Sequence, residues 1–247
     1  MLPRFHVALG AQPQAGATLE LPAGATRHVQ VLRLQPGAPI VLFDGSGGEW
    51  TAVVERIGRQ SVQVRLEAFV AVDRELPCSV TLALGMPAND RMDTLVEKAA
   101  ELGAAAIQPL VCERSVLRLA GERAQRKVAH WQAVAAAACE QSGRTRVPAV
   151  APVRPLPEWL AGLAPPGAEG RLLMSLEEAR PLAALGANRP PAWIALSGPE
   201  GGLSAGEQGL ARARGFMPVS LGARVLRADT APLALLAGLA LAAEGSR

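Results

Sequence analysis

Two patterns of hydrophobic and polar positions divide the chain, and the first covers its N-terminal part. Short apolar runs at residues 40–43, 49–57 and 62–66 are separated by turns that contain glycine. The third run alternates apolar and polar positions, which is the period of a strand with one buried face. Strands of this length, separated by turns at this spacing, are typical of a small barrel or sandwich. We therefore expect residues 1–72 to form a compact β domain.

The second pattern occupies the rest of the chain, where apolar strands alternate with helical periodicity. The strings SVTLALG (79–85) and AAIQPLV (105–111) have the continuous apolar character of strands that are buried on both faces. Segments 89–103 and 121–143 repeat apolar positions every three to four residues and end in glycine, as helices do. Further apolar strands are predicted at 170–176, 192–198 and 216–222. This alternation predicts an α/β domain with a mainly parallel sheet over residues 73–247.

The last predicted helix follows an unusually charged segment. Arg224, Arg227 and Asp229 precede Thr230, after which the chain is almost wholly apolar. A membrane span needs about 20 apolar residues, and this run is shorter and contains Pro232, so we expect a buried helix. Asp229 or Thr230 has the position and the residue type of its N-cap.

The amino-acid composition argues against some classes of protein. Of the 247 residues, 49% are hydrophobic, which is enough for real cores and excludes a disordered chain. The chain has no tyrosine, four Phe and four Trp, which weakens any hypothesis of a sheet that stacks single-stranded bases on aromatic rings. We expect Trp50 and Trp131 to lie in the core. A net charge of +3 is compatible with a polyanionic partner.

The cysteines and histidines indicate neither a disulfide framework nor a metal site. The three cysteines are far apart and form no CxxC pair, which is typical of reduced thiols, and the three histidines lack the spacing of metal ligands. The N-terminal segment is too short and too interrupted for a signal peptide. We expect a cytoplasmic protein with no metal and no membrane attachment.

Three strand ends carry the sequences most typical of a ligand site, because ligands bind outside the carboxyl ends of an open parallel sheet. The chain leaves its strands there as LLMSLEEARP, GPEGGLSAGE and LGARVLRADTA. Glycines around Pro199 and Glu200 let the backbone approach a ligand closely, in a loop that is neither a Walker loop nor a GxGxxG turn. Ser204 and Glu207 have the spacing of a capping box. From the local sequence alone, a tight connection with Glu200 in solvent is equally compatible.

These strings resemble the SPOUT superfamily of knotted methyltransferases. More narrowly, they are similar to the bacterial family that methylates N3 of a uridine in 16S ribosomal RNA. RFHV (4–7), HVQVLRLQPG (28–37) and FDGSGGEW (43–50) resemble its N-terminal domain, and residues 89–116 with EQSGRTRVP (140–148) resemble its catalytic domain. Asp229 departs from the family string, which has Glu there; the carboxylate is kept but shortened by one methylene.

The resemblance implies a fold, a cofactor and a set of contacts. Residues 1–72 would be a PUA-like β-barrel that binds RNA, and residues 73–247 a SPOUT domain with a trefoil knot, active as a homodimer. S-adenosylmethionine (SAM) would bind bent among three loops, without a metal, and leave as S-adenosylhomocysteine. The implied cofactor-binding residues are Leu173, Met174, Ser175, Leu196, Ser197, Gly198, Pro199, Gly201, Gly202, Leu221, Gly222, Leu226 and Ala231. The implied contacts to 16S ribosomal RNA in the small subunit are Arg4, His28, Arg33, Arg114 and Arg144.

The implied chemistry is methyl transfer to uridine N3, which needs a proton acceptor and groups that stabilise the resulting anion. The implied catalytic residues are Glu200 as the first choice of acceptor, Asp229 as the second, and Arg224 and Arg227 as the cationic groups, which could instead contact RNA phosphates. Each has a structural alternative: Glu200 could hold its loop through backbone N–H groups, and one arginine could hold Asp229.

Two other functions remain open at this stage. One is a SPOUT-derived protein that binds RNA without catalysis, but RNA binding alone does not require paired glycine-rich loops around a cofactor site. The other is a SPOUT methyltransferase that acts on a ribose 2′-hydroxyl. The N-terminal strings and EQSGR favour the base-methylating family over this alternative.

Overall fold

The computed structural model describes residues 2–10, 13–88, 91–185 and 190–244. The chain forms two compact units. Unit 1 consists of residues 1–75 and 136–147, and unit 2 of residues 76–135 and 148–247. The N-terminal unit is therefore discontinuous in sequence, because it includes the last turns of helix α3 (Gly121–Ser142) and the segment that follows.

Unit 1 is built on a five-stranded sheet with the strand order β1-β3-β4-β5-β2. Its strands and its helix are β1 (Arg4–His6), β2 (Thr18–Glu20), α1 (Ala23–Val31), β3 (Pro39–Phe43), β4 (Glu49–Ile57) and β5 (Val62–Val70). Neighbouring strands are antiparallel, except that β1 and β3 run parallel. The alternating side chains of Val62, Val64 and Leu66 are buried against Val29 of α1 and Trp50 of β4. The predicted inward face of the third strand and the core position of Trp50 are confirmed.

Unit 2 contains an eight-stranded sheet with the order β11-β13-β10-β12-β6-β7-β8, in which β9 also pairs with β7. Its strands are β6 (Ser79–Gly85), β7 (Ala106–Val111), β8 (Ala149–Val150), β9 (Arg154–Pro155), β10 (Gly170–Met174), β11 (Arg180–Pro181), β12 (Ala192–Ser197) and β13 (Met217–Ser220). Every pair among these described strands is parallel. The predicted α/β class is confirmed.

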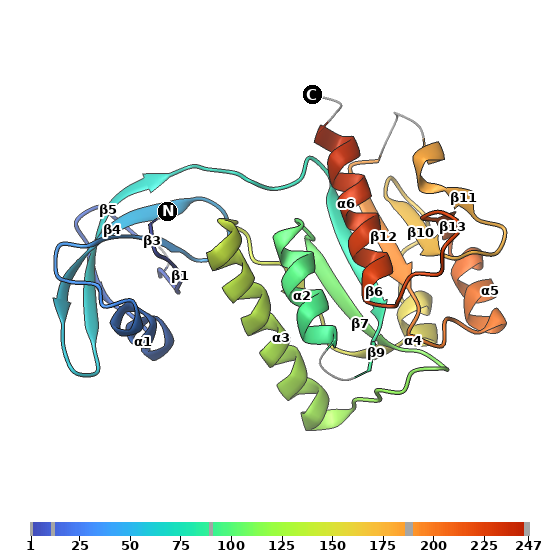
Figure 1. Cartoon of the computed structure of the whole chain (residues 1–247), viewed down its shortest axis with the longest axis horizontal. Helices are drawn as coiled ribbons and strands as arrows, with labels where there is room; N and C mark the ends of the chain where they lie inside the picture. The colour runs from blue at the N-terminus through green and yellow to red at the C-terminus, as the bar shows by residue number, and fades with distance from the viewer. Residues whose placement is uncertain (1, 11–12, 89–90, 186–189, 245–247) are drawn as a thin grey trace. The chain divides into compact units, whose positions relative to one another are not determined.

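Helices cover both faces of this sheet. They are α2 (Arg91–Glu101), α4 (Leu156–Ala161), α5 (Ala205–Ala213) and α6 (Thr230–Glu244), with the 3₁₀ helix η1 (Leu182–Leu185). Trp159 of α4 and Phe216 before β13 pack with Leu173 and Leu196 on one face. Helix α6 contacts α2, β6 and β12, and Figure 1 shows α2 and α6 together in front of the strands.

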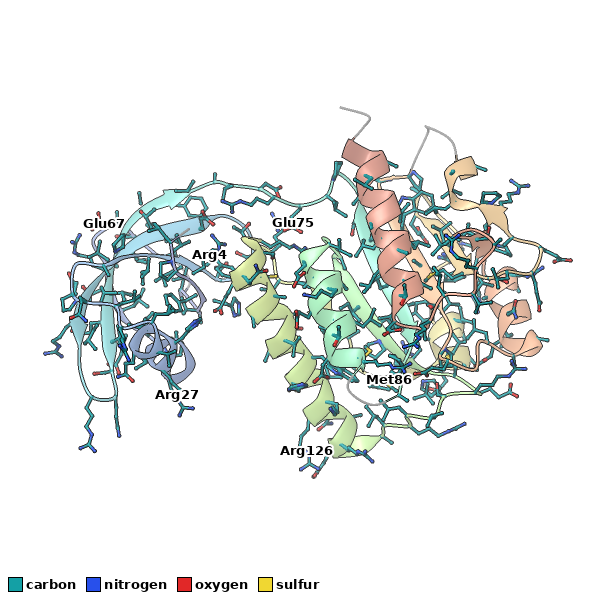
Figure 2. All side chains as sticks on the ribbon, in the orientation of Figure 1. Arg4, Arg27, Glu67, Glu75, Met86 and Arg126 are labelled. Atoms are coloured by element: carbon teal, nitrogen blue, oxygen red, sulfur yellow. The ribbon has the colours of Figure 1, made fainter. Side chains whose placement is uncertain are left out.

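Burial separates the interior of each unit from its surface. Met86, which follows β6, is fully buried, whereas Arg27 on α1 and Arg126 on α3 extend away from the ribbon (Figure 2). Trp131 of α3 is 1% exposed, as predicted for a core residue. Over the part of the chain that the structure describes, none of the helices combines the length and the apolar character of a membrane span.

Candidate active site

A cavity of about 660 Å³ lies in unit 2 at the carboxyl ends of three neighbouring strands. Strand β10 lies between β12 and β13, with Leu173 opposite Leu196 and Met174 opposite Val219. Because the three strands are parallel, the segments that follow them leave the sheet at the same edge. The cavity is lined mainly by these three segments, which are the ones that the sequence singled out.

Most of the residues expected to bind the cofactor line this cavity. Those that line the cavity are Leu173, Met174, Ser175, Ser197, Gly198, Pro199, Gly202, Leu221, Leu226 and Ala231. Three others do not line it. Leu196 is fully buried in the core, Gly201 lies against Arg114, and Gly222 is exposed.

The glycine-rich loop after β12 is packed tightly onto the end of β6. A Cβ atom on Gly85 would lie 2.6 Å from the nitrogen of Pro199, so only glycine allows this approach. The loop then enters α5 through Ser204, whose side chain accepts a hydrogen bond from Glu207 N while the Glu207 carboxylate accepts one from Ser204 N. The predicted capping box is confirmed.

Glu200 lines the cavity, but its carboxylate is already engaged. Oε1 accepts a hydrogen bond from the backbone N–H of Ala88 at 2.9 Å and lies 3.5 Å from Nη1 of Arg91. Both partners lie beyond the end of β6, so the side chain fastens its loop to that strand end. This geometry agrees with the loop-holding alternative for Glu200.

Four arginines line the cavity: Arg91, Arg114, Arg224 and Arg227. Arg91 faces Glu200, and Nη1 of Arg114 donates to the carbonyl oxygen of Gly201 at 3.0 Å. Arg224 and Arg227 are exposed, and neither guanidinium group has a hydrogen bond or an ion pair within the described parts of the chain. Their positive charge is therefore available to an anionic ligand.

Asp229 does not line the cavity. It is partly buried just before α6, and its Oδ1 atom is buried without a hydrogen-bond partner among the described residues. At the start of α6 the backbone N–H groups of Thr230 and Ala231 each donate a hydrogen bond of 3.0 Å to the carbonyl oxygen of Arg227. The expected contact between Asp229 and one of the two arginines is absent from the described residues.

Two of the residues expected to contact RNA, Arg4 and Arg144, are buried and paired inside unit 1. Arg4 is 7% exposed, forms an ion pair with Glu49 and donates to the carbonyl oxygen of Arg144 at 3.0 Å. Arg144 is 4% exposed and forms an ion pair with Glu75. A phosphate cannot reach either guanidinium group in this structure.

Glu49 has a second arginine partner besides Arg4, namely Arg74. Its carboxylate accepts hydrogen bonds from Arg74 as well as from Arg4. Burial opposes the ionisation of Glu49, but the hydrogen bonds from Arg74 and Arg4 outweigh it and hold its pKa below the usual value of 4.5. Through these bonds the network joins the N-terminal part of unit 1 to the segment after α3, which belongs to the same unit.

The other expected RNA contacts stay on the surface. His28 is exposed on α1, with its ring edge against Phe5 at a centroid distance of 5.4 Å. Arg33 is exposed in a left-handed backbone conformation, with φ of 53°. Arg114 is exposed at the cavity, in a different unit from His28 and Arg33.

Some residues that line the cavity were not predicted as site residues from the sequence. Arg91 begins α2 far away in the sequence, Glu177 follows Ser175 in the loop after β10, and Gln208 comes from the first turns of α5. Ser175 Oγ accepts the N–H of Glu177 at 3.0 Å, while the Glu177 carboxylate has no partner within the described parts of the chain. The string LLMSLEEARP marked Glu177 as a loop residue; nothing in the local sequence marked Arg91 or Gln208.

Comparison with known proteins identifies the family. Residues 74–240 match the family described as an RNA methyltransferase domain, and residues 21–67 match the RNA methyltransferase PUA domain. A ribosomal RNA small subunit methyltransferase E from Synechocystis is 38% identical over 90% of this chain and 72% of its own length. One from Bacillus subtilis is 27% identical over 98% and 97% of the two chains.

A solved structure extends the likeness to the whole fold. The crystal structure of a ribosomal RNA small subunit methyltransferase E from Neisseria gonorrhoeae, bound to S-adenosyl methionine, is 36% identical and superposes with a TM-score of 0.89. The match covers 97% of each chain. The protein therefore belongs to the RNA methyltransferase family that includes the ribosomal RNA small subunit methyltransferase E proteins.

Proposed function

We propose that the protein transfers a methyl group from SAM to N3 of a uridine in the RNA of the small ribosomal subunit. The observation that carries the proposal is the cavity at the ends of β10, β12 and β13, where a glycine-rich loop meets the guanidinium groups of Arg224 and Arg227, which have no partners among the described residues. The similar protein from Neisseria gonorrhoeae was crystallised with SAM, which supports the same cofactor here.

The cavity fits the chemistry of SAM. Leu173, Leu221 and Leu226 supply apolar surface for a planar base, and Ser197 to Gly202 bring backbone groups close to the ligand. Gln208 adds a polar side chain to the lining of this cavity. The cavity volume of about 660 Å³ is within the usual range for a small-molecule site.

When bound, SAM supplies a methyl group on a positively charged sulfur. The protein then has to hold the uracil ring in line with that methyl group and favour the form of the ring that has lost its N3 proton. Arg224 and Arg227 are suited to the second task, because cations near the uracil oxygens stabilise the negative charge that develops there. Removing one such group in other enzymes slows the reaction by about 10²–10³-fold.

The proton acceptor needs a carboxylate that is free to receive a proton. Glu200 already accepts from Ala88 N and faces Arg91, and Asp229 does not line the cavity. Glu177 does line the cavity, is exposed, and has a carboxylate without a partner among the described residues. Glu177 is therefore the better-placed acceptor, with Glu200 mainly holding the loop.

The proposal includes a homodimer and a knotted chain. Helix α6 is apolar around its circumference, and Leu241 is 72% exposed, which is the character of a helix that packs on a second copy. Strand β13 lies on the far side of β10 from β12, yet the chain returns from β13 so that α6 packs on β12 and β6. Such a crossing is what a trefoil knot requires.

One experiment tests the function in two steps. Saturating SAM is expected to raise the thermal midpoint of the purified protein, because a ligand that binds only the folded state stabilises it. Small-subunit ribosomal RNA from cells that lack the gene is then expected to lose one methylated uridine, which the purified protein and SAM restore in vitro. No thermal shift contradicts the cofactor, and an unchanged methylation map contradicts the substrate.

A further inference from the structure

Glu207 makes more contacts than a capping box requires. Its side chain is buried, and Oε2 accepts the N–H of Ser204 at 2.9 Å, which completes the cap of α5. The other oxygen, Oε1, accepts the N–H of Glu113 at 2.8 Å, from the loop after β7. One carboxylate therefore joins the start of α5 to a segment about ninety residues away in sequence.

The loop after β7 is itself a closed turn. Cys112 N donates to Ser115 Oγ at 2.9 Å, and Nη2 of Arg118 donates to the carbonyl oxygen of Glu113 at 2.9 Å. Ser115 is buried. The backbone around Arg114 is thus held on both sides, and the bond to Glu207 fixes where the whole turn lies.

Arg114 is the residue that this turn presents to the cavity. Its Nη1 donates to the carbonyl oxygen of Gly201 at 3.0 Å, and a Cβ on Gly201 would lie only 3.0 Å from the Cβ of Arg114. The side chain therefore lies flat against the glycine-rich loop and lines the cavity. That carbonyl is neutral, and no carboxylate of the described residues pairs with Arg114, so its positive charge is left for a ligand.

The two bonds of Glu207 require a carboxylate, because each of its two oxygens accepts one backbone N–H. Burial, and next the charge of Glu207, raise the pKa of the neighbouring Cys112 thiol to about 12. Two backbone N–H groups and the positive end of α5 stabilise the carboxylate. An amide at this position would keep one acceptor and turn an NH₂ group toward the other N–H, so it cannot hold both loops.

We propose that Glu207 is a positioning residue that holds Arg114 at the cavity rim, where Arg114 binds a phosphate of the RNA substrate next to the target nucleotide. The inference rests on the proposed function for its ligand and goes beyond it by assigning this pair of residues. A guanidinium group that is displaced by about 1 Å loses much of its effect on binding and rate. Loss of Glu207 therefore acts on RNA through Arg114.

The test is a double-mutant cycle on RNA binding, read without turnover. The probe is small-subunit ribosomal RNA transcribed in vitro, titrated at several salt concentrations. Arg114→Met is expected to weaken binding about tenfold and to lower the salt slope by about one, as for one lost phosphate contact. Glu207→Gln is expected to do nearly the same, and the double variant to be no worse than Arg114→Met alone.

A matched control separates positioning from folding. Ser204→Ala removes the hydroxyl half of the same cap but leaves the Glu207–Glu113 bond, so it is expected to lower the thermal midpoint by about 2–4 °C without changing the salt slope. Glu207→Asp keeps the charge but is too short to reach both loops, and serves if Glu207→Gln does not fold. SAM affinity is expected to stay within about threefold in all variants, because none of them substitutes the apolar residues Leu173, Leu221 and Leu226 or residues 197–202 of the loop after β12.

Three results would overturn the proposal: additive losses in the double variant, an unchanged salt slope in Arg114→Met, or the same RNA defect in Ser204→Ala. Failure of the proposed function gives a different pattern. In that case the wild-type protein binds the RNA without SAM-dependent methylation, while the coupling between Glu207 and Arg114 is still measurable from binding alone.

Discussion

Oε1 of Glu200 lies 2.9 Å from the backbone nitrogen of Ala88, and it accepts that N–H as a hydrogen bond. The bond ties the glycine-rich loop after β12 to the segment after β6. A carboxylate that acts through this bond needs only an acceptor oxygen, whereas a proton acceptor needs an ionisable group. The two roles predict different responses to substitution.

Glu200→Gln is expected to keep turnover and SAM affinity within about threefold of wild type, because the amide oxygen still accepts from Ala88 N. Glu200→Ala removes the acceptor and is expected to weaken both by about tenfold. Isothermal titration with SAM and single-turnover methylation measure the two quantities. If Gln is as damaging to turnover as Ala while SAM affinity is unchanged, Glu200 is the proton acceptor after all.

Arg224→Met and Arg227→Met are expected to slow methyl transfer, by about 10²–10³-fold for whichever arginine faces the uracil oxygens. SAM affinity is expected to change little, since apolar and backbone groups supply most of the cofactor wall. The measurement is the single-turnover rate at saturating RNA. Arg212→Met, which breaks a surface pair with Glu178, is the matched control and should leave the rate unchanged. Equal, small effects in all three variants would contradict the anion-stabilising role.

Gln208→Met is expected to have two effects of opposite sign. Oε1 of Gln208 is buried without a partner among the described residues, so removing it should raise the thermal midpoint of the ligand-free protein by about 2–4 °C. Because the residue also lines the cavity, the variant should gain less stability from added SAM.

Gln132→Met is the control for this experiment, since the Gln132 side chain bonds both Pro148 O and Val150 N. That variant is expected to be less stable than wild type and to respond normally to SAM. Thermal scans with and without SAM distinguish the two cases. A destabilised Gln208→Met protein would mean that the glutamine has a purely structural role.

Glu49→Gln is expected to destabilise unit 1 in a pH-dependent way. The pKa of Glu49 is lower in the folded protein than its usual value of 4.5, so the folded state holds fewer protons between the two values. The stabilisation is complete above pH 4.5 and is lost as the pH falls through the lowered pKa. The variant should lose about 3–5 kcal/mol at pH 7, because the buried guanidinium group of Arg4 loses its charged partner, while the pair with the more exposed Arg74 adds little.

Urea titrations at pH 7 and pH 3.5 check this expectation, and the difference from wild type should shrink at the lower pH. Glu55→Gln breaks a half-exposed pair with Arg65 and should cost less than about 1 kcal/mol at either pH. A difference that is the same at both pH values would show that packing, not charge, accounts for the loss.

Leu241→Glu is expected to convert a dimer into monomers, because a charge on the apolar face of α6 cannot be buried against a second copy. Size-exclusion chromatography with light scattering measures the mass. Leu210→Glu on α5, a half-exposed leucine on another helix, is the control. A monomeric wild-type protein would contradict the proposed assembly directly.

The sequence predicted the long elements well, because each has enough residues to display a period. The run at 49–57 became β4 with those bounds, and the helix at 121–143 became α3, ending before Gly143. Strands of two or three residues, such as β1, β8 and β11, were not predicted, since so few residues carry no period. Their pairing is decided by the tertiary structure.

The same distinction explains the site. The loops after β10, β12 and β13 could be singled out because parallel strands end at one edge. Arg4 and Arg144 could not be separated from surface arginines, because their partners Glu49 and Glu75 are distant in sequence. The second bond of Glu207 could not be predicted either. A capping box joins residues three apart in sequence, whereas Glu113 is distant in sequence and reaches Glu207 only in the folded chain.

The divided sequence of unit 1 sets the order in which the protein can mature on the ribosome. Its β strands are complete once residue 70 has emerged, but Arg144 and the segment up to Val147 arrive only after a large part of unit 2 has been made. At about 5–20 residues per second, this delay lasts several seconds. During that time Glu75 lacks the buried cation that pairs with it in the finished protein. The N-terminal unit is thus begun first, but it cannot be completed until the first part of unit 2 has also been made.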